Sequence, residues 1–318
     1  MHVVIQKQCF GPVVKKYGEF IPGCHRFNAF SVIVLGILFL TGGCVPLKHA
    51  RVASVALTLE DVAAAASRQS DPLMVREGSA AHILLVDGLI EAYPRNPELL
   101  LAGCQAYSSY AASFIVDEDP RRASELFFKA REYGFRALSS REDFSAAAEG
   151  SLEDFEALLQ KYRKRDVAAL FWTANAWANW VALNLEKVEA IADLPALEAL
   201  MKRVLALDEG FHYGSPHVLM GVYEASKPPA IGGSPQRAKA HFHSAFELGA
   251  HKLLTAKVLY AEYYARAVQD ESLFVRTLEE VLAAHPGEVP ELTLSNTLGQ
   301  HRARKLLNKR EEYFEELP

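Results

Sequence analysis

One spacing recurs along this chain and constrains its fold more than any other feature. A small or apolar residue is followed by an apolar one four positions later, and by a small or apolar one seven positions later. Because an α-helix makes one turn in about 3.6 residues, the three residues share one helical face. Four such sets occur: Ala123, Phe127 and Ala130; Leu197, Met201 and Val204; Ala238, Phe242 and Ala245; Phe274, Leu278 and Val281.

Each set follows another amphipathic stretch, and small residues recur in both. The preceding stretches contain Leu99, Ala102 and Gly103; Trp172 and Ala176; Met220 and Gly221; Ala261 and Tyr264. Small residues let paired helices approach closely, and larger ones fill the gaps between pairs. This pattern is typical of tetratricopeptide (TPR) repeats. It is degenerate, since Gly103 and Ala123 are 20 positions apart where a standard repeat has about 12. A generic helical bundle is the alternative.

Helix starts are legible as well. Proline is tolerated at the first helical position, because its missing N–H would have no partner there. Ser151 with Asp154 resembles a capping box. We count about eleven or twelve helices, and predict an all-α fold: a helical hairpin array of degenerate TPR-like repeats forming one compact superhelical body over residues 58–318. The prolines placed at helix starts are Pro72, Pro97, Pro120, Pro195, Pro235 and Pro290.

The first 43 residues have a different composition. Four basic residues and one acidic residue precede an apolar run over residues 29–40, which is followed by Thr41, two glycines and Cys44. A run of 12 is short for a bilayer span, which needs roughly 20 residues. The order predicts a lipoprotein signal peptide over 1–43, lipidation of Cys44 and a tether over 44–57. Thr41 stands where such boxes usually have Leu, and an uncleaved membrane anchor or a core helix is the alternative.

Removal of that segment changes the charge. The whole chain has 34 basic and 39 acidic residues, so the remainder has 30 and 38, a net charge of −8. An acidic body argues against nonspecific nucleic-acid binding. Of four cysteines, Cys104 alone would remain as a free thiol, and its apolar neighbours predict a core residue.

No catalytic or cofactor motif is found. Nucleophile elbows, zinc-protease motifs and phosphate-binding loops are absent, so we predict no enzyme, no catalytic residues and no cofactor. His241 and His243 are two positions apart on a predicted helix and point away from each other, so no metal site is predicted. Gly232 and Gly233 follow no strand, and a stiff turn between helices is expected there.

Aromatic residues concentrate on the first helices of the predicted pairs. In a TPR superhelix these helices line the concave face, where an apolar groove or channel with polar handles would suit a ligand. Packing of the core is the alternative interpretation. The candidate pore-lining residues are Trp172, Asn175, Trp177, Tyr107, Tyr223, Tyr260 and Tyr264.

Four segments together resemble a known family. Over nearly all of residues 72–312 the chain is similar to the TatT lipoprotein component of TPR-protein-associated TRAP (tripartite ATP-independent periplasmic) transporters. The segments that carry the resemblance are Gly88 to Leu100, Leu170 to Trp177, Gly221 to Ala238 and Ala256 to Arg266.

The resemblance implies cryptic TPR motifs, a homotrimer and a pore through each protomer. It also implies that the protein binds the periplasmic solute-binding subunit, while the permease subunits are contacted indirectly. The expected function is that of a periplasmic adaptor, anchored by the lipidated cysteine at the inner membrane, that holds or passes a hydrophobic organic acid. The alternative is a TPR lipoprotein scaffold that binds peptide segments in envelope assembly.

Overall fold

Helix starts in the structure follow the prolines. In the computed structural model, which describes residues 58–139, 143–229 and 232–314, Asp71, Asn96, Asp119 and Ser234 each accept a hydrogen bond from a backbone N–H of the following helix. Proline stands at the first position of all four helices, and these starts are confirmed. The helices are α3 (Pro72–Ala92), α4 (Pro97–Tyr110), α5 (Pro120–Leu138) and α12 (Pro235–Leu248).

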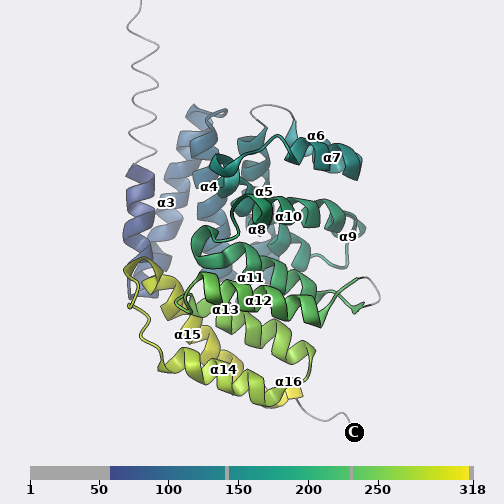
Figure 1. Ribbon diagram of the computed structural model, residues 1–318. Coiled ribbons are helices and arrows are strands. Elements are labelled where there is room, and N and C mark those ends of the chain that lie inside the picture. The colour runs from purple at the N-terminus through teal and green to yellow at the C-terminus, as the bar shows by residue number, and fades with distance from the viewer. Residues whose placement is uncertain (1–57, 140–142, 230–231, 315–318) are drawn as a thin grey trace, which may run out of the picture. The chain divides into compact units, whose positions relative to one another are not determined.

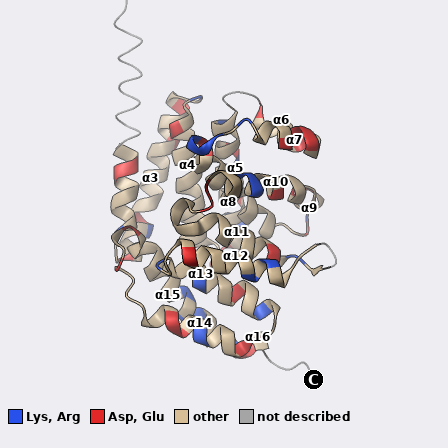
Figure 2. Cartoon of the chain, viewed as in Figure 1, with Lys and Arg blue, Asp and Glu red and all other residues tan. Residues whose placement is uncertain are grey.

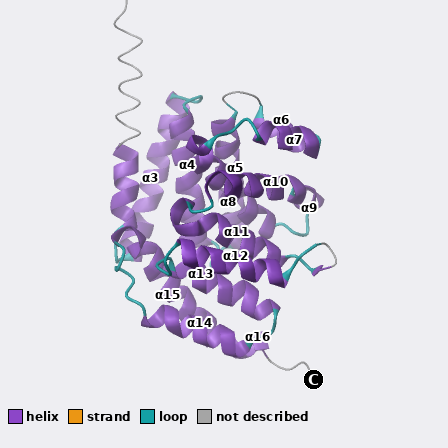
Figure 3. Cartoon of the chain, in the orientation of Figure 1, coloured by secondary structure: helices purple, strands orange, loops and turns teal. Residues whose placement is uncertain are grey.

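The described residues form helices, turns and loops without strands, so the all-α prediction is confirmed (Figure 3). A helix over residues 58–67 precedes α3. Short α6, α9 and α16 raise the number above the predicted eleven or twelve, because segments this short show no helical period. The other helices are α6 (Phe144–Glu149), α7 (Leu152–Leu159), α8 (Val167–Ala182), α9 (Val188–Ala192), α10 (Leu194–Asp208), α11 (Phe211–Ser226), α13 (Leu254–Leu259), α14 (Glu271–Ala283), α15 (Thr293–Asn308) and α16 (Arg310–Phe314).

Two π-helices extend first helices of the predicted pairs. Segment η1 (Ala111–Ile115) continues α4 without a break, and η4 (Tyr260–Ala265) continues α13. Insertions of this kind widen the helix by one residue and often stand near functional sites. Two short 3₁₀ segments, η2 (Lys164–Asp166) and η5 (Pro290–Leu292), precede α8 and α15.

The predicted helix pairs are present. α4 packs on α5, α8 on α10 and α11 on α12 (Figure 1). Segment η4 packs on α14. All twelve residues of the four recurrent sets are buried. At Gly221 a Cβ would lie 2.9 Å from the ring of Phe242, and at Gly103 it would lie 2.7 Å from Tyr133. The small residues therefore set the distance between paired helices, as predicted.

The last helices return to the first repeat. α15 contacts α3, and Lys305 Nζ lies 3.4 Å from Asp117 in the turn after η1. Arg302 donates two hydrogen bonds to Glu262 of η4, at 2.8 and 2.9 Å. Residues almost two hundred positions apart are thus tied together within the unit Ala53–Pro318.

The largest core cluster is aromatic at its centre. Phe135 contacts Phe144 and Trp177 edge-on, at centroid distances of 5.2 and 5.1 Å. Cys104 is fully buried, as predicted, and burial raises the pKa of its thiol to about 12.

Among the described residues, no helix has the length and apolarity that crossing a bilayer requires. The predicted signal peptide, Cys44 and the tether lie outside the described residues.

Candidate functional site

Three of the predicted pore-lining residues bond to carboxylates of the protein itself. The hydroxyl of Tyr107 donates to Asp87 at 2.7 Å, and that of Tyr223 donates to Glu198 at 2.9 Å. The indole N–H of Trp177 donates to Asp193 at 2.6 Å. Trp177 is only 1% exposed and packs within the core. These polar handles serve contacts within the protein, and the role of the three residues in lining a pore stays a prediction.

Trp172 and Asn175 lie on the half-buried face of α8. The indole of Trp172 packs edge-on against Phe171 at 5.5 Å and approaches His212 at 6.4 Å. The side-chain amide of Asn179 donates to the backbone carbonyl of Asn175 at 2.8 Å. Both candidates keep exposed surface, and their role in lining a pore stays a prediction.

Tyr260 and Tyr264 are the two candidates that the structure brings together. Both lie on η4, and their rings stack at 4.9 Å with an angle of 7° between the planes. Tyr260 is buried, and burial raises the pKa of its hydroxyl to about 12. Tyr264 stays half-exposed, so the stack presents one aromatic face to the surface.

That face borders a cleft between α12 and the end of η4. The cleft has a volume of about 540 Å³ and is open on one side. Tyr264 and Val268 form one wall, and α12 forms the other. Lys239 carries the one permanent charge among the residues that line it. The α12 wall consists of Pro235, Gln236, Lys239, Ala240 and His243.

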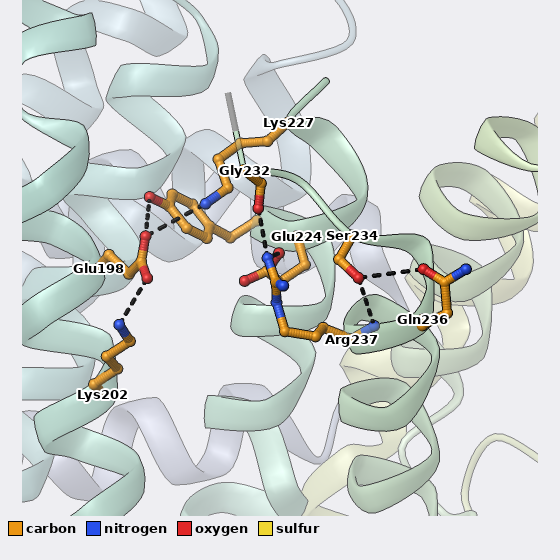
Figure 4. Close-up of polar contacts among 9 residues, drawn as sticks. Glu198, Lys202, Glu224, Lys227, Gly232, Ser234, Gln236 and Arg237 are labelled. Carbon is orange, nitrogen blue, oxygen red and sulfur yellow. Dashed lines mark hydrogen bonds and ion pairs between the residues drawn. The ribbon is translucent and has the colours of Figure 1, made fainter. Parts of the chain in front are cut away.

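A polar network fixes the start of α12, and so positions one wall of the cleft (Figure 4). Arg237 donates to the buried carboxylate of Glu224 at 2.9 Å and also to the carbonyl of Gly232. The hydroxyl of Ser234 accepts from the backbone N–H of Arg237 at 3.2 Å and donates to Gln236 at 3.3 Å. The turn before α12 is therefore tied to α11.

The second half of the network joins α10 to α11. Glu198 accepts from Tyr223, forms an ion pair with Lys202 at 2.8 Å, and lies 3.3 Å from Lys227 (Figure 4). Lys227 also stands over the ring of Tyr223, 4.0 Å from its centroid. Burial acts to raise the pKa of Glu198. The hydrogen bonds from Lys202 and Tyr223 and the charge of Lys227 outweigh it and lower that pKa to about 2.

The depressed pKa predicts an acid-dependent contribution to stability. We expect Glu198 to stabilise the fold fully above its usual pKa of 4.5, and less as the pH falls toward about 2. Glu198→Gln should remove this pH dependence. Compared with the unsubstituted protein, the variant should therefore show its largest loss of stability at neutral pH and almost no loss near pH 2. Urea unfolding across this range measures it, with exposed Glu186→Gln as the control. An equal loss at every pH would contradict the assignment.

The partner residues were not found from the sequence. Glu198, Asp193 and Asp87 stand 25, 16 and 20 positions away from the aromatic residues they bind. No local spacing marks such pairs, and only the packing of helices brings them together. Lys239 and Val268 were missed for the same reason.

One histidine of α11 pairs with one of α12. His217 and His241 approach through their Nδ1 atoms at 2.9 Å, and Glu209 lies 3.2 Å from the other nitrogen of His217. Burial, together with the nearby His217, lowers the pKa of His241. Across the part of the chain that the structure describes, no group of three or more His, Cys, Asp or Glu side chains is arranged to hold a metal ion.

Comparison with known proteins gives the family. None of the curated proteins matches this chain. A family model, TAtT, described as the TRAP transporter T-component, matches residues 68–314, which include every described helix from α3 to α16. The resemblance found in the sequence is thereby confirmed, and this is a family of transporter accessory components rather than of enzymes. The chain belongs to the TAtT family, the T-components of TRAP transporters.

Proposed function

We propose that this T-component is a membrane-anchored periplasmic adaptor that binds the solute-binding subunit and holds an amphipathic organic acid at the cleft between α12 and η4. The observation that carries the ligand proposal is the composition of the cleft. A stacked tyrosine and Val268 offer an apolar wall, and Lys239 is the one permanent charge on the opposite wall.

The chemistry of the walls favours an anion with an apolar tail. The tail can lie against Tyr264 and Val268, where burial of apolar surface drives binding. The carboxylate can pair with the ammonium of Lys239. Because Lys239 is exposed, that contact is screened by salt and contributes little more than about 1 kcal/mol. An open cleft with one exposed cation suits reversible, low-affinity holding of a ligand.

Isothermal titration with octanoate tests the cleft. We expect Tyr264→Ala to weaken octanoate binding at least about fivefold, and Lys239→Gln to weaken it by up to about fivefold, the value that a loss of about 1 kcal/mol gives. Lys239→Gln should leave the binding of octanol unchanged, because octanol has no charge. Lys187→Gln, which removes an exposed lysine on the loop before α9, is the control. Octanoate binding that is equal in all four proteins would overturn the proposal.

The adaptor role is supported by family membership, which implies association with TRAP subunits. The finer points are part of the same proposal: docking to the solute-binding subunit, assembly as a homotrimer, an internal pore, and anchoring at the inner membrane through Cys44. Co-sedimentation of a form that starts after Cys44 with the solute-binding subunit tests the docking. Mass-spectrometric detection of acyl chains on the N-terminal cysteine tests the anchor.

A further inference from the structure

Two polar contacts cross between α11 and α12. The ion pair of Arg237 with Glu224 lies near the loop that connects the helices. The contact of His217 with His241 lies about one to two helical turns farther from that loop. Glu224 is the only Asp, Glu, Lys or Arg in α11, so most of this helix is uncharged (Figure 2). The histidine contact is thus a polar link in a largely uncharged part of the interface.

The histidine contact depends on how many protons the two rings carry. The Nδ1 atoms lie 2.9 Å apart, so one must donate its proton and the other must accept it with a free lone pair. Glu209 lies 3.2 Å from Nε2 of His217 and can accept from it, so the pair tolerates one positive charge. When both rings are protonated, neither Nδ1 atom can accept, and two like charges face each other. Repulsion then replaces the hydrogen bond.

The groups around the pair oppose that second proton. Burial and the nearby His217 lower the pKa of His241, Arg237 acts in the same direction, and Glu224 opposes them. Glu209 follows the end of α10, while Glu224 and Arg237 come from α11 and α12. Of the other elements that pack on α11, the described residues of α8, α13 and η4 form no hydrogen bond or ion pair with either imidazole. The second proton is therefore taken up below the ordinary histidine pKa of 6.5.

Beyond the histidines, the backbone at this end of the helix pair is strained. His212 and Tyr213 have φ of 43° and 60° at the start of α11, and Ala250 and His251 have φ of 46° and 59° after α12. This left-handed conformation costs about 1–2 kcal/mol for a residue with a side chain. The two segments touch, since a Cβ at Gly249 would lie 2.8 Å from the backbone oxygen of Tyr213. Strain persists only where surrounding contacts enforce it, so this end favours separation once the histidine contact is lost.

Helix α11 supports both walls of the cleft. It packs on α12, which forms one wall, and on η4, which carries Tyr264 of the other wall. Ala240 and His243 line the cleft from the same helix turn that carries His241. Movement of α12 away from α11 therefore displaces this wall relative to Tyr264.

We propose that the His217–His241 contact is a pH-sensitive joint between α11 and α12. With one charge or none it holds the helices together. When both imidazoles are protonated, α12 loosens from α11 and the cleft loses its α12 wall. The joint itself is independent of the proposed function, whereas its effect on a ligand rests on that function. A ligand held at neutral pH is then released in acid.

Urea unfolding at about pH 8 and about pH 5.5 tests the joint. Unfolding restores the ordinary pKa of His241, so the unfolded chain binds more protons below 6.5, and stability should fall as the pH falls. In His241→Gln this loss should be smaller, because the amide can donate to His217 and takes up no proton. His301→Gln, at an exposed histidine of α15, is the matched control and should keep the full loss. Glu198 does not interfere, since its contribution is lost only below 4.5.

NMR on isotope-labelled histidine shows the contact directly. We expect a scalar coupling between the two Nδ1 nuclei at about pH 8 that disappears at about pH 5.5. A coupling that is absent at about pH 8 or still present at about pH 5.5 would overturn the proposal. So would an equal loss of stability in His241→Gln and the unsubstituted protein.

Octanol, whose charge does not depend on pH, tests the effect on the cleft. Isothermal titration should show weaker binding at about pH 5.5 than at about pH 8, and His241→Gln should bind octanol equally at both. His243 lines the cleft in both proteins, so its contribution cancels in the comparison. Equal binding by the unsubstituted protein at both pH values would overturn the link from joint to cleft. Binding at neither pH would contradict the proposed function instead, while unfolding and NMR still decide whether the joint exists.

Discussion

Arg237→Met should lower the free energy of unfolding, because it leaves the buried carboxylate of Glu224 without its ion-pair partner. Since Arg237 itself is more than half exposed, the loss should be smaller than for a fully buried ion pair. The carboxylate of Glu224 is only 4% exposed, and Arg237 is its ion-pair partner at 2.9 Å. Methionine keeps the length of the side chain and removes its charge. The same change releases the carbonyl of Gly232, so the turn before α12 should loosen too. Urea unfolding followed by circular dichroism measures the loss.

The double variant isolates the cause. Glu224→Met combined with Arg237→Met removes both charges, and we expect it to recover most of the stability lost in Arg237→Met. Arg121→Met is the matched control, because Arg121 is almost fully exposed and should change stability by less than about 0.5 kcal/mol. A double variant as unstable as Arg237→Met would show that the buried carboxylate is not the cause.

Gly221→Leu should destabilise the fold by at least about 2 kcal/mol. The Cβ that any larger residue adds would lie 2.9 Å from two ring carbons of Phe242, which has no exposed surface in which to move. Overpacking of a filled core typically costs about 1–3 kcal/mol, and a leucine adds further atoms at the same place. Gly221→Ala should also lower the free energy of unfolding, but by less. Thermal and urea unfolding measure both.

Gly78→Ala is the opposite case. It adds the same Cβ to a helix where nothing lies within 4 Å, so stability should rise by up to about 1 kcal/mol. A gain for Gly221→Ala would contradict the view that this glycine sets the distance between α11 and α12.

The sequence by itself determined the helices and their pairing. A helix start depends on residues within one turn, and Pro97 after Asn96 or Pro235 after Ser234 marks it without reference to the rest of the chain. The recurrent spacing likewise fixes which face of a helix is buried. Phe127 and Phe242 were therefore predictable as core residues, and so was the close packing at Gly103 and Gly221.

Only the tertiary structure decided what those helices present to one another and to solvent. The carboxylate that accepts the hydrogen bond from the Tyr223 hydroxyl comes from a neighbouring helix. The cleft combines side chains of α12 with Tyr264 and Val268. The pattern that identifies an aromatic residue on a first helix does not say whether its side chain lines a channel or packs in the core, and only the structure shows that Trp177 is 1% exposed. Burial and hydrogen bonding depend on which helices surround a side chain, and helical periodicity carries no information about neighbours distant in sequence.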